Sequence, residues 1–323
     1  MEQKQKRYNI YSQHLKKKYG EKVYKLPINL PVTCPNRDGE LGEGGCTFCG
    51  EVGTGFESQC NTVSIEDQLA LNMKHIRKRY GAKKFIAYFQ NFTNTYLSLD
   101  LFEDALRRAC QVDIVELCIS SRPDCVSDAY LNILQKISAE MNVNISFELG
   151  LQTVNYHSLK KINRGHGLAE FLDAVKRIQN YGFEICTHLI LNLPWDDNDD
   201  SEEAARLLGA MGVEQIKIHS LYILKNTILG DQYLNKEFDI ITVEEYVDRV
   251  IQFIRLSNPN TVFQRFVGRA PKEDSLFCNW NMSWWKIQDM IDSKMESHNY
   301  KQGDLFTYLN GKAVQKYTNR EEG

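Results

Sequence analysis

Short apolar segments alternate with longer amphipathic segments along most of this chain, at intervals of roughly thirty residues. The apolar segments have the length of buried strands, whereas the amphipathic segments repeat apolar residues at the three- and four-residue spacing of a helix. Ser64, with Asp67 three residues later, is typical of a helix start. We expect strands at 24–30, 85–90, 114–120, 143–150, within 183–193 and at 215–221, and helices at 8–23, 65–80, 100–110, 127–138, 168–181, 201–211 and 243–257.

Repeated strand–helix units predict an α/β fold in which helices cover a parallel sheet. The six units counted here are fewer than those of a complete barrel. We therefore predict a partial (β/α)6 TIM-like barrel, with functional residues at the carboxyl ends of the strands. The expected organisation is a basic helical segment at 1–23, the barrel at 24–257 and a C-terminal extension at 258–323 packed on it. A candidate strand at 262–267 and a tryptophan-containing helix near 283–296 lie in the extension.

The composition is typical of a soluble globular enzyme, because 42% of the 323 residues are hydrophobic and 25% are charged. A net charge of −3 gives no overall field that would attract nucleic acid, although residues 1–25 are locally basic. The N-terminus lacks the apolar region of a secretory signal, and no run approaches the ~20 apolar residues of a membrane span. Nine cysteines over a long chain do not suggest a disulfide framework. We expect a cytoplasmic protein without a membrane partner.

A glycine-rich loop at 32–56 follows the first expected strand and contains Cys34, Cys46 and Cys49 in the spacing C-x11-C-x2-C. A structural zinc site uses four protein ligands, so three thiols are better suited to an iron–sulfur cluster that leaves one iron open. The position of the loop after a barrel strand also favours an active site. Two alternatives remain at this point: zinc with Cys60 as the fourth ligand, and no metal.

Beyond the cysteines, the sequence resembles the radical S-adenosylmethionine (radical SAM) superfamily, in the branch similar to the elongator catalytic subunit and, within it, the YhcC/YtqA-like bacterial subfamily. The similarity covers about residues 7–310. The usual spacing in the superfamily is C-x3-C-x2-C, and the loop here is eight residues longer. The matching segments are P-N-R-D-G at 35–39, G-G-C-T-F-C-G at 44–50, S-S-R-P-D at 120–124, E-L-G-L-Q-T at 148–153, N-R-G-H at 163–166, H-L-I-L-N-L-P at 188–194, K-I-H-S-L-Y at 217–222 and Q-R-F-V-G-R-A-P at 264–271.

This resemblance implies that Cys34, Cys46 and Cys49 are the metal ligands and catalytic centre, holding a 4Fe–4S cluster whose fourth iron binds S-adenosylmethionine. Reduction of the cluster would cleave this cofactor to a 5′-deoxyadenosyl radical, which would abstract a hydrogen atom from the substrate. A reductase such as flavodoxin or ferredoxin is the implied electron donor. The hard chemistry belongs to the cofactor, and the protein supplies placement.

The resemblance also implies which residues contact S-adenosylmethionine. Gln90 and Asn94 stand where related enzymes have a glycine-rich segment against the methionine amino group. Arg164 matches an arginine that pairs with the methionine carboxylate, a bidentate task suited to guanidinium. The remaining expected contacts are Glu148 and Gln152 with the ribose, and Leu193 and Pro194 with the adenine.

Several other residues have competing interpretations. Arg122 could meet the substrate or pair with Asp124, and His188 and His219 are better read as hydrogen-bonded core residues. Cys118, Cys125 and Cys186 are expected to be buried apolar groups, and the acidic run 196–200 to cap a helix. Trp284 and Trp285 could stack on bases, although packing of the extension on the barrel is the interpretation we favour.

The same resemblance implies tRNA as the partner and the side chain of the wobble uridine as the site of reaction. No acetyltransferase segment is found in this sequence, so we expect remodelling of an already modified uridine. The basic residues of 1–25, interleaved with tyrosines, are compatible with a surface that follows phosphates, and equally with a solvated helix. The alternatives are a radical SAM enzyme acting on a small, porphyrinogen-like metabolite, and a non-catalytic zinc- or cluster-binding protein.

Overall fold

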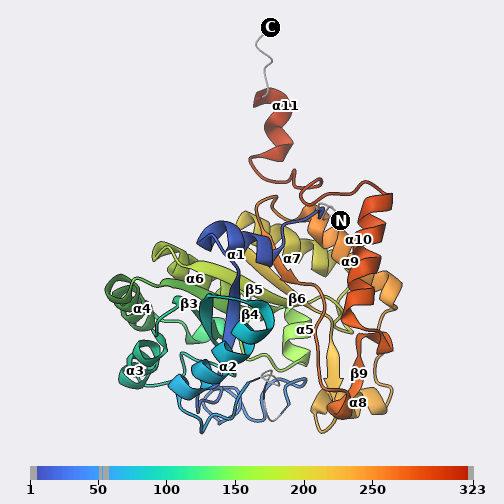
Figure 1. Ribbon diagram of the computed structural model, residues 1–323. Coiled ribbons are helices and arrows are strands. Elements are labelled where there is room, and N and C mark those ends of the chain that lie inside the picture. Colours follow the sequence, from blue (N-terminus) through green and yellow to red (C-terminus); the bar gives the residue numbers. More distant parts are fainter. Residues whose placement is uncertain (1–5, 51–52, 54–57, 319–323) are drawn as a thin grey trace.

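A curved sheet of seven parallel strands forms the centre of the protein, whose computed structural model describes residues 6–50, 53 and 58–318 (Figure 1). The strands are ordered β1-β2-β3-β4-β5-β6-β8, so each new strand is added beside the previous one. The predicted α/β partial barrel is therefore confirmed. Its strands are β1 (Val23–Ile28), β2 (Lys84–Phe89), β3 (Ile114–Ser121), β4 (Asn144–Gln152), β5 (Glu184–Ile190), β6 (Gln215–His219) and β8 (Val262–Arg265).

The seventh strand, β8, comes from the segment 258–323 and pairs with β6 in parallel. It coincides with the candidate strand at 262–267. A small antiparallel sheet of β7 (Tyr222–Leu224) and β9 (Ser275–Cys278) lies beyond it and has no counterpart among the predicted elements. These two strands are too short to show a two-residue alternation in the sequence.

Helices cover the outer face of the sheet, which is apolar. Phe85, Phe89 and Phe147 on the strands are fully buried with Phe102, Phe171 and other helix residues. Ser64 begins α2 as predicted, because its side chain accepts a hydrogen bond from the backbone of Asp67. The covering helices are α2 (Ile65–Tyr80), α3 (Leu99–Ala109), α4 (Asp128–Met141), α6 (Leu168–Asn180), α7 (Asn198–Ala210) and α9 (Val243–Leu256), and the others are α1 (Tyr11–Tyr19), α5 (Tyr156–Lys161), α8 (Ile228–Leu234), α10 (Trp284–Ser297) and α11 (Gln315–Thr318).

Helix α1 fills the inner face of the sheet at the amino ends of the strands, opposite the loop after β1 (Figure 1). Leu15 packs there against Val23 of β1 and Cys118 of β3. Lys18 makes ion pairs with Glu116 and Glu184 at 3.1 and 2.9 Å. Part of the basic charge predicted for a phosphate-binding surface is therefore used inside the barrel.

Parts of two predicted segments lie outside the described residues: 51–52 and 54–57 at the end of the cysteine loop, and 1–5 of the basic N-terminal segment. Residues 319–323 are also outside them. Within the described chain, no helix has both the length and the apolar character needed to cross a membrane.

Candidate active site

Cys34, Cys46 and Cys49 line one cavity of about 130 Å³ at the carboxyl ends of the strands. Hydrogen bonds fold their loop back on itself, because the backbone N–H of Gly45 donates to the carbonyl of Asn36 at 2.7 Å. Another backbone bond, from Thr47 to Ile162 at 3.0 Å, attaches the loop to the segment after α5. The three thiols that the sequence predicted to act together are thus brought to one site.

Each thiol of this cavity is approached by the guanidinium group of a different arginine. The three arginines follow β1, β3 and α5, so the cation set is assembled from distant parts of the chain. Sequence reasoning predicted a cofactor role for only one of them. The contacts are Arg37 Nη1 to Cys49 Sγ at 3.6 Å, Arg122 Nη1 to Cys34 Sγ at 3.8 Å and Arg164 Nη1 to Cys46 Sγ at 3.6 Å.

The spacing of the three sulfurs does not fit a single zinc ion. Tetrahedral zinc with Zn–S bonds of about 2.3 Å brings its sulfurs to about 3.8 Å from one another. Among the described residues, the three thiols do not form a group of ligand atoms within 4.8 Å of one another. Cys60 is exposed and does not line the cavity. At least one pair of these sulfurs is therefore more than 4.8 Å apart, and this spacing with three cationic donors fits a larger, negatively charged iron–sulfur group.

Strand β4 ends in a close arrangement of Gly150, Gln152 and Arg164. Arg164 is buried and donates from Nη2 to the carbonyl of Gly150 at 2.9 Å, whereas its Nε is buried without a hydrogen-bond partner. A methyl group at position 150 would lie 2.7 Å from Arg164 Nη2 and 2.8 Å from Gln152 Nε2. Both side chains line the cysteine cavity, so the structure brings these two predicted contacts together.

The segment after β2 presents Gln90, Phe92 and Thr93 to the same cavity. The Thr93 hydroxyl is buried without a hydrogen-bond partner, although sequence reasoning did not select this residue. Asn94 does not line the cavity, because its amide nitrogen donates to three backbone carbonyls at 2.9–3.1 Å and holds the loop in place. Leu193 is buried and Pro194 half-buried in a turn after β5, and neither is among the residues that line this cavity.

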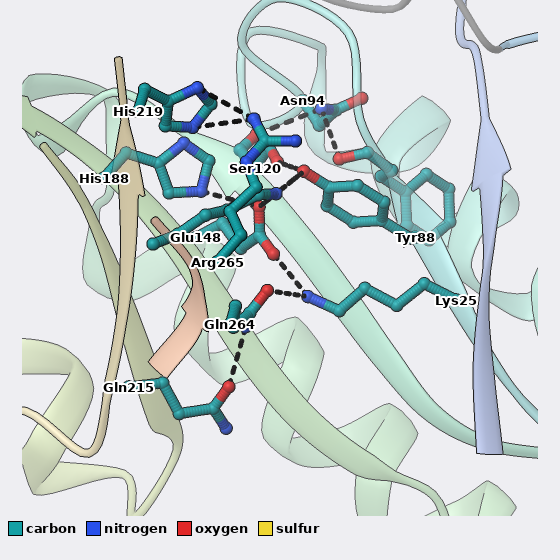
Figure 2. A network of polar contacts seen from close by, with 12 residues as sticks. Lys25, Tyr88, Asn94, Ser120, Glu148, His188, Gln215, His219, Gln264 and Arg265 are labelled. Atoms are coloured by element: carbon teal, nitrogen blue, oxygen red, sulfur yellow. Dashed lines mark hydrogen bonds and ion pairs between the residues drawn. The ribbon is translucent and has the colours of Figure 1, made fainter. Parts of the chain in front are cut away.

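Glu148 lies at the centre of a buried polar network on the inner face of the sheet (Figure 2). Its carboxylate accepts from Lys25 of β1, Tyr88 of β2, Lys217 of β6 at 2.8 Å and His188 of β5 at 2.7 Å. The carboxylate also lines the cysteine cavity. Because these four donors already occupy its oxygens, the Glu148 carboxylate is less free to accept hydrogen bonds from ribose hydroxyls than the sequence suggested.

The network holds a fixed set of charges. Burial acts to raise the pKa of Glu148, but the ammonium groups of Lys217 and Lys25 outweigh it and hold that pKa well below its usual value. Burial lowers the pKa of His188 to about 4, against the opposing effect of Glu148. His188 is therefore neutral near pH 7 and donates from Nε2, because an ionised carboxylate can only accept.

A second cavity, of about 690 Å³, adjoins the first and shares Tyr88, Gln90 and His188 with it. Trp284 and Arg269 lie at this cavity, with the guanidinium 4.4 Å from the indole ring centroid. Trp284 and Trp285 are 44% and 50% exposed, so each is partly packed and partly open to solvent, and the packing of one or both onto the barrel stays a prediction.

Two family descriptions match the chain: Radical SAM superfamily over residues 28–208, and Radical_SAM C-terminal domain over residues 213–297. The protein belongs to the radical SAM superfamily. Its cofactors are accordingly a 4Fe–4S cluster and S-adenosylmethionine, as the resemblance implied. The cysteine cavity meets that expectation with three thiols, three guanidinium groups and two unpartnered polar atoms.

Relatives of similar length support this membership. This radical SAM protein is 30% identical over 306 residues to YtqA of Bacillus subtilis (strain 168), covering 94% of each chain. It is 32% identical over 297 residues to YhcC of Escherichia coli (strain K12), covering 92% of this chain and 94% of YhcC. It is also 24% identical over 151 residues to the tRNA uridine(34) acetyltransferase of Methanocaldococcus infernus, covering 46% of this chain and 27% of that protein.

The fold of this radical SAM protein is similar to that of the archaeal Elp3 from Methanocaldococcus infernus. The TM-score is 0.66 at 15% identity, covering 92% of this chain and 68% of that chain. At this identity the likeness concerns the fold.

The remaining candidates take simpler roles. Arg122 pairs with Asp124 at 2.6 Å in addition to approaching Cys34. Cys118 and Cys186 are buried as expected, and Asp197 caps α7. Lys25, Tyr88 and Lys217 were not selected from the sequence. The signal for the two lysines is a lysine between apolar neighbours in a strand, which points to the inner face.

Proposed function

We propose that this radical SAM enzyme modifies the side chain of an already modified wobble uridine in tRNA. The observation that carries the proposal is the similarity to a tRNA uridine(34) acetyltransferase, which covers 46% of this chain. Two features of the site support it. The 690 Å³ cavity is large enough for a nucleoside, and the exposed face of Trp284 offers a stacking surface for a base.

We assign the cluster to Cys34, Cys46 and Cys49. When bound, the cluster and S-adenosylmethionine supply a 5′-deoxyadenosyl radical that abstracts a hydrogen atom. The chain's own contribution is to hold three thiolates together, and three guanidinium groups offset their mutual repulsion at 3.6–3.8 Å. Phe48 and Phe92 line the same cavity and reduce the access of water.

In this proposal the methionine end of S-adenosylmethionine would lie between the thiols and the end of β4. Arg164 binds the methionine carboxylate through its unpartnered Nε, and Gln152 remains a ribose contact. The hydroxyl of Thr93, rather than the side chain of Asn94, is the proposed partner of the methionine amino group, because Thr93 lines the cavity and Asn94 does not. Glu148 acts mainly by fixing Lys25, Lys217 and His188, and Leu193 and Pro194 stay as candidates for adenine contacts.

Nucleosides from total tRNA of a deletion strain, compared with the parent by mass spectrometry, test the substrate. The expected result is the loss of one wobble-uridine derivative and the accumulation of its precursor. Complementation with the wild-type gene should reverse the change, whereas Cys46→Ser should not. Cys60→Ser is the matched control, since Cys60 is exposed and away from the cavity, and it should complement fully.

Two outcomes would overturn parts of the proposal separately. Unchanged wobble nucleosides in both oxic and anoxic cultures would exclude the tRNA substrate and leave a small metabolite as the alternative. A reconstituted, dithionite-reduced protein that releases no 5′-deoxyadenosine from S-adenosylmethionine would exclude the catalytic assignment itself.

A further inference from the structure

The larger cavity carries an excess of positive charge. Its lining contains the cationic side chains Lys217, Arg265 and Arg269, together with two histidines, and no aspartate or glutamate belongs to it within the described chain. Glu148, which does not line this cavity, pairs with Lys217 and is shared with Lys25. One carboxylate therefore faces two ammonium groups, and the guanidinium groups add further charge that this network does not neutralise.

Arg265 is a half-buried cation with few partners, whereas Arg269 is exposed. It stands at the carboxyl end of β8 beside Lys217, with which it is in register. In the described part of the chain, no carboxylate lies within 4.0 Å of its guanidinium group, and its Nε is buried without a hydrogen-bond partner. Its contact is with the imidazole of His219, where Nη2 lies 2.8 Å from Nδ1 and 2.9 Å from Nε2 (Figure 2).

His219 does not compensate the charge of Arg265. Burial, then Arg265 and His188, hold the pKa of His219 well below its usual value, so the ring is neutral near pH 7. A neutral ring can orient a guanidinium group but cannot balance it. A half-buried cation without a counter-charge is unfavourable in a site partly removed from water.

We propose that Arg265, with Lys217 beside it, forms a subsite for an anionic group of the substrate, a carboxylate or a phosphate. The inference rests on the proposed function, because it assumes that the substrate occupies the cavity next to the cofactor. A guanidinium fork matches the geometry of both anions. The cavity shares Tyr88, Gln90 and His188 with the cysteine cavity, so the anion fixes the substrate within reach of the radical.

Chemical labelling tests the subsite without any turnover. Reconstituted holoenzyme with S-adenosylmethionine is treated with phenylglyoxal in chloride, acetate or inorganic phosphate at equal ionic strength, and labelling of each arginine is followed by peptide mass spectrometry. Arg265 should label at least about fivefold more slowly in acetate, in phosphate or in both. Arg255, which pairs with Asp304 and lies over Tyr300, is the internal control and should label equally in all three.

The two anions distinguish the source of the charge. Slower labelling in acetate alone indicates a carboxylate on the substrate, and slower labelling in phosphate alone indicates a nucleotide phosphate. Equal labelling of Arg265 in all three salts, or no labelling even in chloride, would overturn the subsite. The second result would mean that the guanidinium group cannot be reached from the cavity.

Kinetics of variants then separate this inference from the proposed function. Arg265→Gln should lower substrate modification by about ten- to a hundredfold, and Arg265→Lys should recover part of the loss. Release of 5′-deoxyadenosine without substrate is measured on each variant to check that the cofactor site, whose lining does not include Arg265, is still assembled. Arg255→Gln is the matched substitution outside the cavity. If Arg265→Gln releases 5′-deoxyadenosine at the wild-type rate and its substrate KM is unchanged, the subsite alone is rejected. If the wild-type protein itself releases no 5′-deoxyadenosine, the catalytic assignment is rejected.

Discussion

At the scale of single residues, the cysteine cavity is defined by pairs that the sequence separates widely. Arg122 and Cys34 are 88 positions apart, and Arg164 and Cys46 are 118 apart. The thiols could be predicted, since their spacing is local and chemically restrictive. Arg37 could not, because an arginine in a loop has no periodic signal that reveals which sulfur it approaches.

Gly150 is the residue where a small change has the clearest expected effect on cofactor binding. In Gly150→Ala the new methyl group would displace Arg164 and Gln152, which lie 2.7 and 2.8 Å from its position. We expect at least a tenfold weaker affinity for S-adenosylmethionine, about 1.4 kcal/mol, measured by calorimetry on the reconstituted protein. Gly167→Ala is the control, because its methyl group would meet only Glu170 Oε2 at 3.5 Å. Equal affinity in both variants would contradict the assigned position of Arg164.

His188 gives a prediction for stability against pH. Burial lowers its pKa from 6.5 to about 4, so the unfolded chain binds more protons than the folded protein between these values. The stability associated with neutral His188 is therefore fully present above pH 6.5 and is lost as the pH falls toward 4. Between pH 6.5 and 5 the loss is at most about 2 kcal/mol. Urea unfolding of the wild type and of His188→Gln at both pH values measures this loss of unfolding free energy. Equal losses in the two proteins would contradict its assignment to His188.

At the scale of elements, α1 is an internal part of the barrel. Leu15 is 3% exposed and lies against the inner face of β1 and β3. Leu15→Ala should lower the free energy of unfolding by about 2–5 kcal/mol, as measured by urea denaturation. Lys17→Ala on the exposed side of the same helix should change it by less than about 0.5 kcal/mol. A small effect of Leu15→Ala would mean that α1 is only loosely attached to the sheet.

The sequence was sufficient for the long elements and for the position of β8, but not for β7 and β9 or for the pairing of the short strands. The six strand–helix units follow from periodicity, because each helix buries one continuous stripe. Strand β8 has four residues, and β7 and β9 are equally brief, so their pairing is decided by tertiary contacts. The polar inner face could be predicted in part, because Lys25 and Lys217 each stand between apolar neighbours in their strands. Their common partner, Glu148, required the register of the sheet.

At the scale of the whole molecule, the C-terminal segment contributes to the main sheet and its covering layer. Truncation after residue 257 removes β8 and α10, and so exposes the edge of β6 and the buried face of α9. We expect this shortened chain to be insoluble on expression. A chain truncated after residue 310 keeps Tyr308, which donates to the carbonyl of Leu256 at 3.0 Å. Its melting temperature should lie within a few degrees of that of the full chain. Soluble, cooperatively melting protein from the first truncation would contradict this account.

The shared carboxylate of Glu148 has a mechanical consequence. From β4 in the middle of the sheet, it joins Lys25 on β1 to Lys217 on β6, and the edge strands β1 and β8 do not pair with each other within the described chain. Without that negative charge, as in Glu148→Gln, the two ammonium groups would repel each other and the half-barrel would widen. The thiols follow the first strand, whereas Arg265 neighbours the sixth. Together with the hydrogen bond from Lys25 to Gln264 of β8 at 3.2 Å, this side chain helps to set the distance between the thiols and Arg265. In the proposed reaction, hydrogen transfer weakens steeply when the reacting atoms move apart.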